Sequence, residues 1–227
     1  MTTRRDPDYG ARTMNGTYFV NRLRLAAPAL LMLCCLLVSA CGSVLESGKP
    51  ARQVYLLEAP DTAGSPAVSG PLSTLIVSVS AVPGLDTDDI QVLSSDAQMI
   101  PVGNAHWVDN MPEVFASVTR RFLSNSGDFS AVRQGSMARP GEWFLELELQ
   151  AFYGTQNSAG VTNSVELKME GQLRCNGHQQ VLHVADQSPA NGESLSSLVA
   201  GHQAVLNGGM KTLLAAIVNA CSQSESK

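Results

Sequence analysis

The chain has 227 residues, and its 15 Lys and Arg against 20 Asp and Glu give a formal net charge of −5. Five of the cationic residues but only two of the acidic residues precede Cys41, so the chain from Cys41 onward carries 10 positive and 18 negative side chains, a net charge of about −8. Nucleic acids and anionic lipid surfaces both attract clustered cations, so this balance argues against binding to either.

The first forty residues have the pattern of a secretory signal peptide. Arginines precede the apolar run Leu25–Val38, which is too short to span a bilayer comfortably. The run ends in Val38-Ser39-Ala40-Cys41, which resembles the bacterial lipobox, where the sulfur of the cysteine receives a diacylglyceryl group. We therefore expect residues 1–40 to be a lipoprotein signal peptide and Cys41 to be lipidated, with translation starting at Met1 or Met14.

The chain after the signal peptide divides into three parts. Residues 41–52 are mostly small and polar and predict a lipid-anchored tether. Each buried CH₂ group contributes about 0.8 kcal/mol, so more than one acyl chain would hold this tether stably in a membrane. Residues 53–221 are long enough for a single domain with a sizeable core, and residues 222–227 are a polar tail.

Turn residues and alternation of apolar with polar side chains predict four strands in the first half of this domain. The loop at residues 59–71 is rich in Pro, Gly and Ser, and Pro83-Gly84 ends the second strand. The predicted strands are Gln53–Glu58, Leu72–Val82, Ile90–Leu93 and Gln98–Pro101.

An amphipathic helix follows, from Met111 to about Ser124, with apolar residues at spacings of three and four. Asp109 stands where the N-cap of this helix is expected, and Trp107 precedes it. Two interpretations of these residues remain open. Asp109 caps the helix and Trp107 packs near its start, or an exposed Trp107 with Asp109 forms a contact for a protein partner.

The second half predicts a strand at Phe129–Arg133 and then three strands of one antiparallel arrangement, joined in part by the hairpin turn Asn176-Gly177. A final helix, roughly Leu195–Ala220, has an apolar stripe that includes His202, and Gly208-Gly209 are expected to weaken its middle. The three strands are Trp143–Tyr153, Ser164–Cys175 and Gln179–Ala185. These elements predict an α+β fold with two layers, a mostly antiparallel sheet packed by two main helices.

Two cysteines remain after the signal peptide and the lipidated Cys41 are set aside. Cys175 shares the apolar face of its strand with Leu173, and Cys221 continues the buried stripe of the last helix. If that helix crosses that sheet face, both thiols point into the same layer. We therefore expect a Cys175–Cys221 disulfide in an oxidising compartment; two buried free thiols are the alternative.

The order of these features resembles the ABC-type transport auxiliary lipoprotein family (the PqiC-like proteins). The resemblance rests on the lipobox and on five later segments. These are Tyr55-Leu56-Leu57, Pro83-Gly84-Leu85-Asp86, the stretch His106–Pro112 with its Trp-x-Asp-x-x-Pro pattern, the strand Leu145–Tyr153, and the long C-terminal helix. The turn after Cys175 and the Cys175/Cys221 pair are not features that we associate with the family.

The resemblance implies a non-catalytic component of a lipid transport system, encoded with an ABC transporter and a mammalian-cell-entry (MCE) domain protein that bridges the periplasm. Its expected role is to dock or receive that partner at the outer membrane, and a second copy of the chain is a further candidate partner. Gly42 after the lipidated cysteine is compatible with the inner leaflet of the outer membrane, facing the periplasm. Two other roles stay open: a lipid carrier that holds an acyl chain between helix and sheet, and a structural envelope lipoprotein.

Catalytic and metal-binding patterns are missing from the sequence. It has neither a Gly-x-Ser-x-Gly elbow nor a His-Glu-x-x-His pair. Asp86-x-Asp88-Asp89 begins like a calcium loop, but its sixth position is Gln91 and its twelfth is Ala97, so a polar turn is expected there. We therefore expect no enzyme activity, no cofactor and no metal, and we expect His202 to be a hydrogen-bonded core residue.

Overall fold

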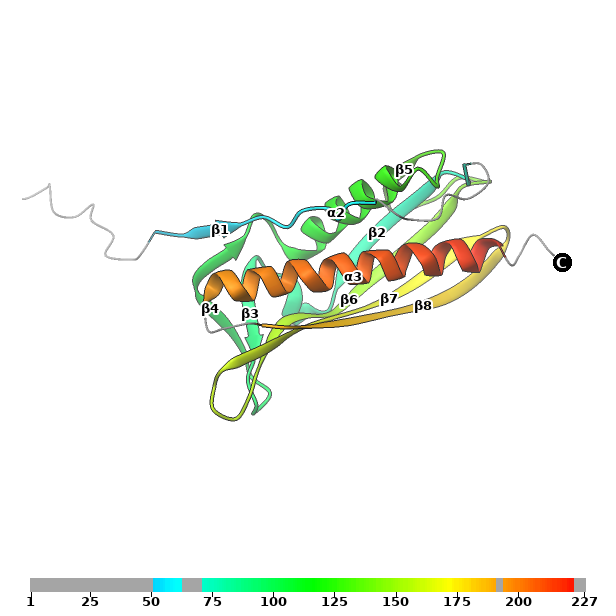
Figure 1. Cartoon of the computed structure of the whole chain (residues 1–227). Coiled ribbons are helices and arrows are strands. Elements are labelled where there is room, and N and C mark those ends of the chain that lie inside the picture. Colours follow the sequence, from blue (N-terminus) through cyan, green and yellow to red (C-terminus); the bar gives the residue numbers. More distant parts are fainter. Residues whose placement is uncertain (1–50, 63–70, 191–193, 223–227) are drawn as a thin grey trace, which may run out of the picture. The chain divides into compact units, whose positions relative to one another are not determined.

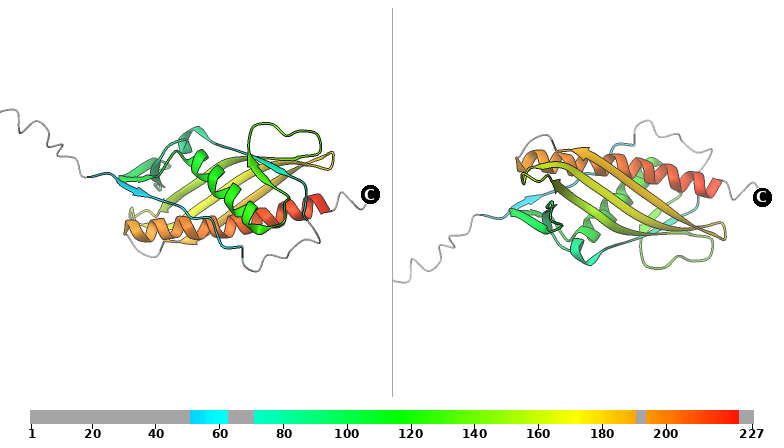
Figure 2. Two further views of the ribbon diagram at one scale, coloured as in Figure 1. Left: turned by 90° about the horizontal axis from the view of Figure 1, so that it is seen from above. Right: turned by 90° about the horizontal axis from the view of Figure 1, so that it is seen from below.

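Eight strands form one mixed sheet, and two long helices cover one of its faces (Figures 1 and 2). The structure, a computed structural model, describes residues 51–62, 71–190 and 194–222. The predicted signal peptide, the lipobox residues Val38, Ser39, Ala40 and Cys41, and nearly all of the predicted tether lie outside these residues. In chain order the elements are β1 (Gln53–Tyr55), β2 (Leu75–Ala81), the 3₁₀ turn η2 (Pro83–Leu85), β3 (Asp89–Leu93), β4 (Met99–Trp107), α2 (Met111–Ser126), β5 (Val132–Gln134), β6 (Trp143–Gln156), β7 (Thr162–Cys175), β8 (His178–Pro189) and α3 (Leu195–Ser222).

The strand β6 is the centre of the sheet. One edge of β6 pairs along its whole length with β7, and β7 pairs in turn with β8, both antiparallel. The other edge of β6 is shared, because β2 pairs in parallel with residues 143–149 and β3 with Gly154 and Thr155. Beyond these lie β5 next to β2, and β4 and then β1 next to β3. Within the described residues, the outermost strands of the sheet are therefore β8, β5 and β1.

The predicted α+β fold with two layers is confirmed, and its longest strand pairs, β6–β7 and β7–β8, are antiparallel as predicted. The sequence did not predict the parallel pairs that the described residues form, which are β1–β4, β2–β5, β2–β6 and β3–β6. Alternation identifies a strand and its buried face, but it carries no information on the direction of the neighbouring strand.

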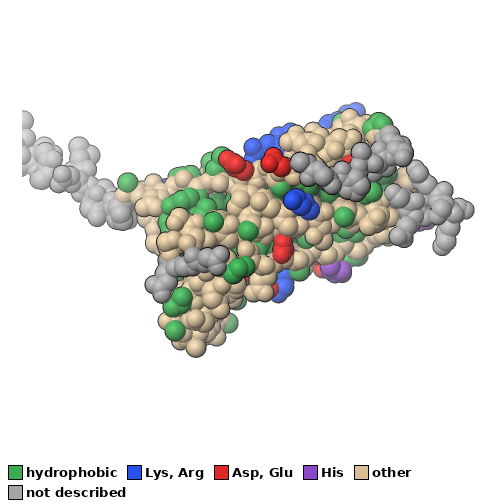
Figure 3. Space-filling model, viewed as in Figure 1, with side chains coloured by type: hydrophobic (Ala, Val, Ile, Leu, Met, Phe, Trp, Pro, Cys, Tyr) green, Lys and Arg blue, Asp and Glu red, His purple; other side chains and the backbone are tan. Residues whose placement is uncertain are grey.

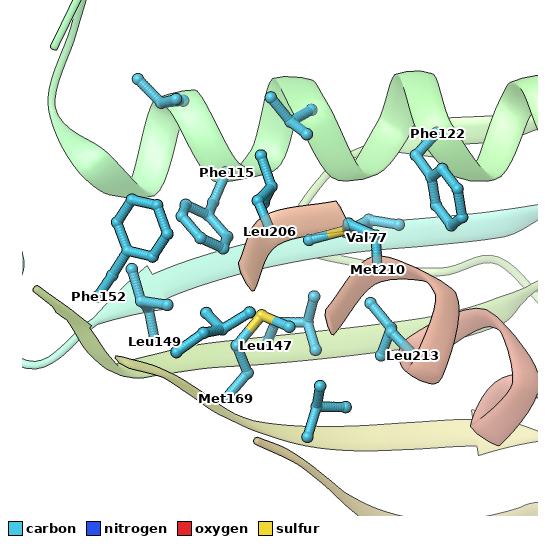
Figure 4. Packing of buried hydrophobic residues seen from close by; sticks show 14 of the residues in the cluster. Val77, Phe115, Phe122, Leu147, Leu149, Phe152, Met169, Leu206, Met210 and Leu213 are labelled. Carbon is cyan, nitrogen blue, oxygen red and sulfur yellow. The ribbon is translucent and has the colours of Figure 1, made fainter. Parts of the chain in front are cut away.

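The core lies between the sheet and the two helices, and Figure 4 shows its centre. From α2, Phe115 and Phe122 point toward the sheet, while Leu206, Met210 and Leu213 approach from α3. The sheet contributes the apolar side of each strand: Leu145, Leu147 and Leu149 of β6 are buried, whereas Glu146 and Glu148 between them are exposed. The predicted alternation on this strand is therefore confirmed.

The start of α2 differs from the prediction. The N-cap is Asn110 rather than Asp109, and its side chain makes no capping hydrogen bond. The carboxylate of Asp109 instead accepts a hydrogen bond from the backbone N–H of Asn110, 2.8 Å away. Pro112 in the first turn, whose missing N–H is not needed there, explains why the helix begins here. The helix continues to Ser126 and ends at Gly127 with φ of +77°, a left-handed conformation that glycine adopts without strain.

The glycines of α3 do not interrupt it, since the helix runs without a break from Leu195 to Ser222. They let it approach the sheet instead. A Cβ atom added at Gly209 would lie 2.3 Å from a methyl group of the buried Leu167 on β7, and one at Gly201 would lie 2.7 Å from a methyl group of Val165. Among the described residues, α3 is also the one helix long and apolar enough to cross a membrane, but half of that stretch is buried inside the domain.

We expect Gly209→Ala to destabilise the domain by about 1–3 kcal/mol, because overpacking against Leu167 outweighs the gain in helix propensity of roughly 1 kcal/mol. Gly208→Ala is the matched control. The added methyl group there would meet the end of the Asp186 side chain, which can rotate away. Denaturant unfolding of both variants tests the prediction, which fails if the two free energies change alike.

Candidate tether and docking site

The described chain enters the domain at β1, and four contacts fix it there. Arg52 forms an ion pair with Asp88, and β1 pairs in parallel with β4. Leu57 is 1% exposed and belongs to the core. The backbone N–H of Glu58 donates to Oε1 of Gln203 on α3, and Nε2 of Gln203 donates to the carbonyl of Glu58, both at 2.9 Å. These contacts join residues 52–58 to the sheet and to α3.

Asp88, Asp89 and His106 lie together next to this entry point, although no sequence pattern indicated that they would. Nδ1 of His106 lies 3.0 Å from Oδ1 of Asp89 and 3.7 Å from Oδ1 of Asp88. The three side chains could offer ligand atoms within 4.8 Å of one another. However, the guanidinium group of Arg52 already pairs with Asp88, and a neighbouring cation disfavours a metal ion. The arrangement is best explained as a polar cluster in which the Arg52–Asp88 ion pair and the close approach of His106 to Asp89 link the residue before β1 to β3 and β4.

Trp107 is 2% exposed and packs in the core (Figure 4 shows the neighbouring Phe152). Its ring makes an edge contact with His202, 5.2 Å between centroids, and Phe152 lies 4.7 Å from the same histidine. The hypothesis that Trp107 contacts a partner is therefore wrong, because its side chain reaches no surface. Asp109 is exposed and remains available to a partner.

His202 is fully buried, as predicted for a core residue, and its Nδ1 lies 2.9 Å from the carbonyl oxygen of Leu198. In the described part of the chain, its Nε2 has no hydrogen-bond partner. Burial disfavours the charged imidazolium and lowers the pKa of His202 from 6.5 to about 4, although the hydrogen bond to Leu198 opposes this.

This low pKa predicts a loss of stability in acid. Below about pH 6.5 the unfolded chain takes up a proton at His202 that the folded domain does not, so stability falls as the pH drops from 6.5 toward 4. The expected contribution is about 3 kcal/mol. His202→Leu should remove this part of the pH dependence in denaturant unfolding, and His178→Leu, at an exposed position, is the control. An unchanged pH profile in His202→Leu would contradict the prediction.

A groove of about 440 Å³ lies between the β3–β4 hairpin, the β6–β7 turn and the first turn of α3. Its lining mixes apolar side chains such as Val92, Ile100 and Leu198 with the polar Gln156 and Ser194. The carrier hypothesis placed an acyl chain between helix and sheet, but that space is filled by side chains such as Phe115 and Met210, which are 0% exposed.

Three aliphatic side chains are exposed beside the entry point: Val54, Leu56 and Val108. The parallel register pairs Val54 with His106 and Tyr55 with Trp107, and Leu56 and Val108 each directly follow this last pair. Figure 3 shows hydrophobic side chains at this end of the molecule. We call Val54, Leu56, Val108 and the neighbouring Asp109 the entry surface.

Comparison with solved structures supports the fold. Protein XCC0632 from Xanthomonas campestris, of the family DUF330, aligns with a TM-score of 0.62 and 15% identity over 77% of this chain and 100% of its own. An uncharacterized protein aligns with a TM-score of 0.54 and 14% identity over 75% of this chain and 99% of its own. None of the curated proteins matches the chain. The family model of the ABC-type transport auxiliary lipoprotein component matches residues 55–212, and the chain therefore belongs to that family.

Proposed function

We propose that the protein is a non-catalytic, lipid-anchored component of an ABC transporter and MCE-type lipid transport system. It would dock or receive the periplasm-spanning MCE partner at the inner leaflet of the outer membrane. The observation that carries this proposal is the family match over residues 55–212, which makes the chain an auxiliary component of ABC-type transport.

The arrangement of the domain supports an anchored docking role. The chain entering from the predicted tether is fixed within a few residues, by Arg52, β1 and the pair of hydrogen bonds between Glu58 and Gln203. A domain held in this way can carry a mechanical load between membrane and partner. Its helix–sheet interface is filled with side chains, so a role as docking module is favoured over a role as lipid carrier.

We place the partner contact on the entry surface. It lies beside the point where the predicted tether joins the domain, and it combines exposed aliphatic side chains with the carboxylate of Asp109. Apolar side chains at the centre with a polar rim are the usual composition of a protein interface.

Capture of the lipidated, full-length protein from envelope extracts tests both proposals. We expect the native protein to recover MCE and transporter components, and Leu56→Asp with Val108→Asp to reduce the recovery at least tenfold. Met137→Asp is the control, because Met137 is 81% exposed but lies in the β5–β6 loop. Capture without any MCE or transporter component, under conditions that preserve these complexes, would contradict the proposed function. An equal loss in the control would contradict only the placement.

A further inference from the structure

Two apolar side chains are buried on the face of the sheet that the helices do not cover. The strand registers place Ile76 of β2 beside Phe144 of β6, with Arg133 of β5 and Arg174 of β7 on either side of this pair. Ile76 and Phe144 are each 4% exposed, although neither belongs to the core cluster beneath the helices. The loop between β5 and β6 lies against them instead, since a Cβ atom at Gly135 would be 3.3 Å from a methyl group of Ile76.

A hollow of about 330 Å³ opens beside this loop. Its lining combines apolar with charged side chains: Ala138, Pro140 and Phe144 with Arg139, Arg174 and Glu142. The guanidinium group of Arg174 lies over the ring of Phe144, 4.7 Å from the ring centre, in a cation–π contact. This contact holds the charged group of Arg174 at the hollow.

The two arginines that line the hollow have no anionic partner among the described residues. The side chain of Arg139 makes no hydrogen bond or ion pair there, and that of Arg174 makes only its contact with Phe144. The carboxylate of Glu142 is already engaged, because it pairs with Arg133 and accepts a hydrogen bond from the backbone N–H of Arg139, 2.8 Å away. Two positive charges therefore stay uncompensated at the hollow, although the chain from Cys41 onward has a net charge of about −8.

We propose that this hollow binds the C-terminal carboxylate of a partner polypeptide whose last residue is apolar. A carboxylate offers about four lone-pair sites in one plane, which suits the planar N–H groups of two guanidinium groups. The last side chain of the partner would pack against Phe144 and Pro140. A chain terminus of this kind places one negative charge next to an apolar group, which is the complement of what the hollow presents.

Two features favour a carboxylate over a phosphate. Phosphate groups are commonly bound by the free N–H groups at the start of a helix, but α2 and α3 begin at Met111 and Leu195, and neither residue lines this hollow. A phosphate would also bring no apolar group to cover Phe144.

The hollow is separate from the entry surface. Arg174 directly precedes Cys175, which pairs with His178 across the turn between β7 and β8. Figure 1 shows this turn at the opposite end of the domain from β1. A polypeptide in the hollow therefore leaves the entry surface free for another contact.

Titration with a short synthetic peptide tests the site, with the full-length lipidated protein in detergent micelles. The probe is Gly-Ser-Ala-Ala-Leu, used up to millimolar concentration, and the Nε–H resonances of isotope-labelled arginines report its binding by NMR. We expect the resonances of Arg139 and Arg174 to shift saturably. The resonance of Arg121, an exposed residue of α2 outside the hollow, should stay unchanged. Amidation of the peptide's C-terminus should weaken binding at least tenfold, because it removes the charge.

Arginine variants test which side chains hold the carboxylate. Arg139→Gln and Arg174→Gln should each weaken binding at least tenfold, followed by the resonance of the arginine that remains. Arg121→Gln is the matched control and should not change binding. Arg174→Lys keeps a positive charge near Phe144 but loses the planar set of N–H donors, so it should weaken binding as well. Arg139→Gln leaves the fold intact, because it removes no side-chain hydrogen bond or ion pair among the described residues.

Several results would overturn the proposal. One is a peptide with a free C-terminus that shifts neither resonance, and another is an amidated peptide that binds equally well. Undiminished binding in both glutamine variants would have the same meaning. Equal binding of an amidated peptide with an internal glutamate would show that the hollow takes an acidic side chain instead. Inorganic phosphate that displaces the probe more readily than acetate does would show a phosphate site.

Discussion

Replacing Cys41 with alanine is expected to leave an unlipidated protein, either as an uncleaved precursor or as a soluble form. The part of the chain after residue 40 carries a net charge of about −8, so no electrostatic attraction to anionic lipid would replace the lost acyl chains. Those chains contribute about 0.8 kcal/mol for each buried CH₂ group, which makes them the dominant source of membrane affinity.

Feeding cells labelled palmitate and fractionating their membranes measures this effect. Cys34→Ala and Cys35→Ala are the matched controls, because both cysteines lie within the apolar part of the predicted signal peptide and should leave labelling of Cys41 unchanged. A Cys41→Ala protein that still incorporates the label would show that the lipobox assignment is wrong.

Local pattern predicted that each strand and helix exists, but not every bound and not every contact between them. The strand expected at Gln98–Pro101, for example, is β4 and runs from Met99 to Trp107. The alternation in Leu145–Gln150 and the spacing from Met111 to Phe122 each identify an element and its buried face, since both periods are set by backbone geometry. The parallel pairing of β2 with β6 joins residues about seventy apart, and nothing in either segment specifies its neighbour.

The contacts at the entry point of the chain could not be predicted from the sequence either. Arg52 and Asp88 pair across 36 residues, and Gln203 reaches Glu58 across 145, so only the three-dimensional arrangement brings them together. The burial of Trp107 could not be predicted for a different reason. The sequence left open whether its ring is buried or exposed, and burial against Phe152 and His202 decides between the two interpretations.

The Cys175–Cys221 disulfide was predicted because both elements fix the direction of their side chains, and the structure contains this bond, with the Cα atoms 5.9 Å apart. It joins the end of β7 to the last turn of α3. Next to it, Asn176 and Gln180 donate side-chain hydrogen bonds to the carbonyl groups of Cys221 and Ala220. Both cysteines are buried, at 3% and 1% exposure, so a reductant reaches the bond only after local opening.

Breaking this bond should therefore destabilise the domain strongly. The bond closes a loop of 46 residues, and loop closure of that length stabilises a folded chain by about 4 kcal/mol in the entropic model. Cys175→Ala and Cys221→Ala should each lower the free energy of unfolding by about this amount. The double variant should cost little more than either single variant, because both changes remove the same bond. Denaturant unfolding gives these energies, and thiol alkylation of the native protein before and after reduction gives the redox state. If both cysteines are alkylated without reductant, or if the two single effects add in full, the cysteines act as separate core residues rather than as a cross-link.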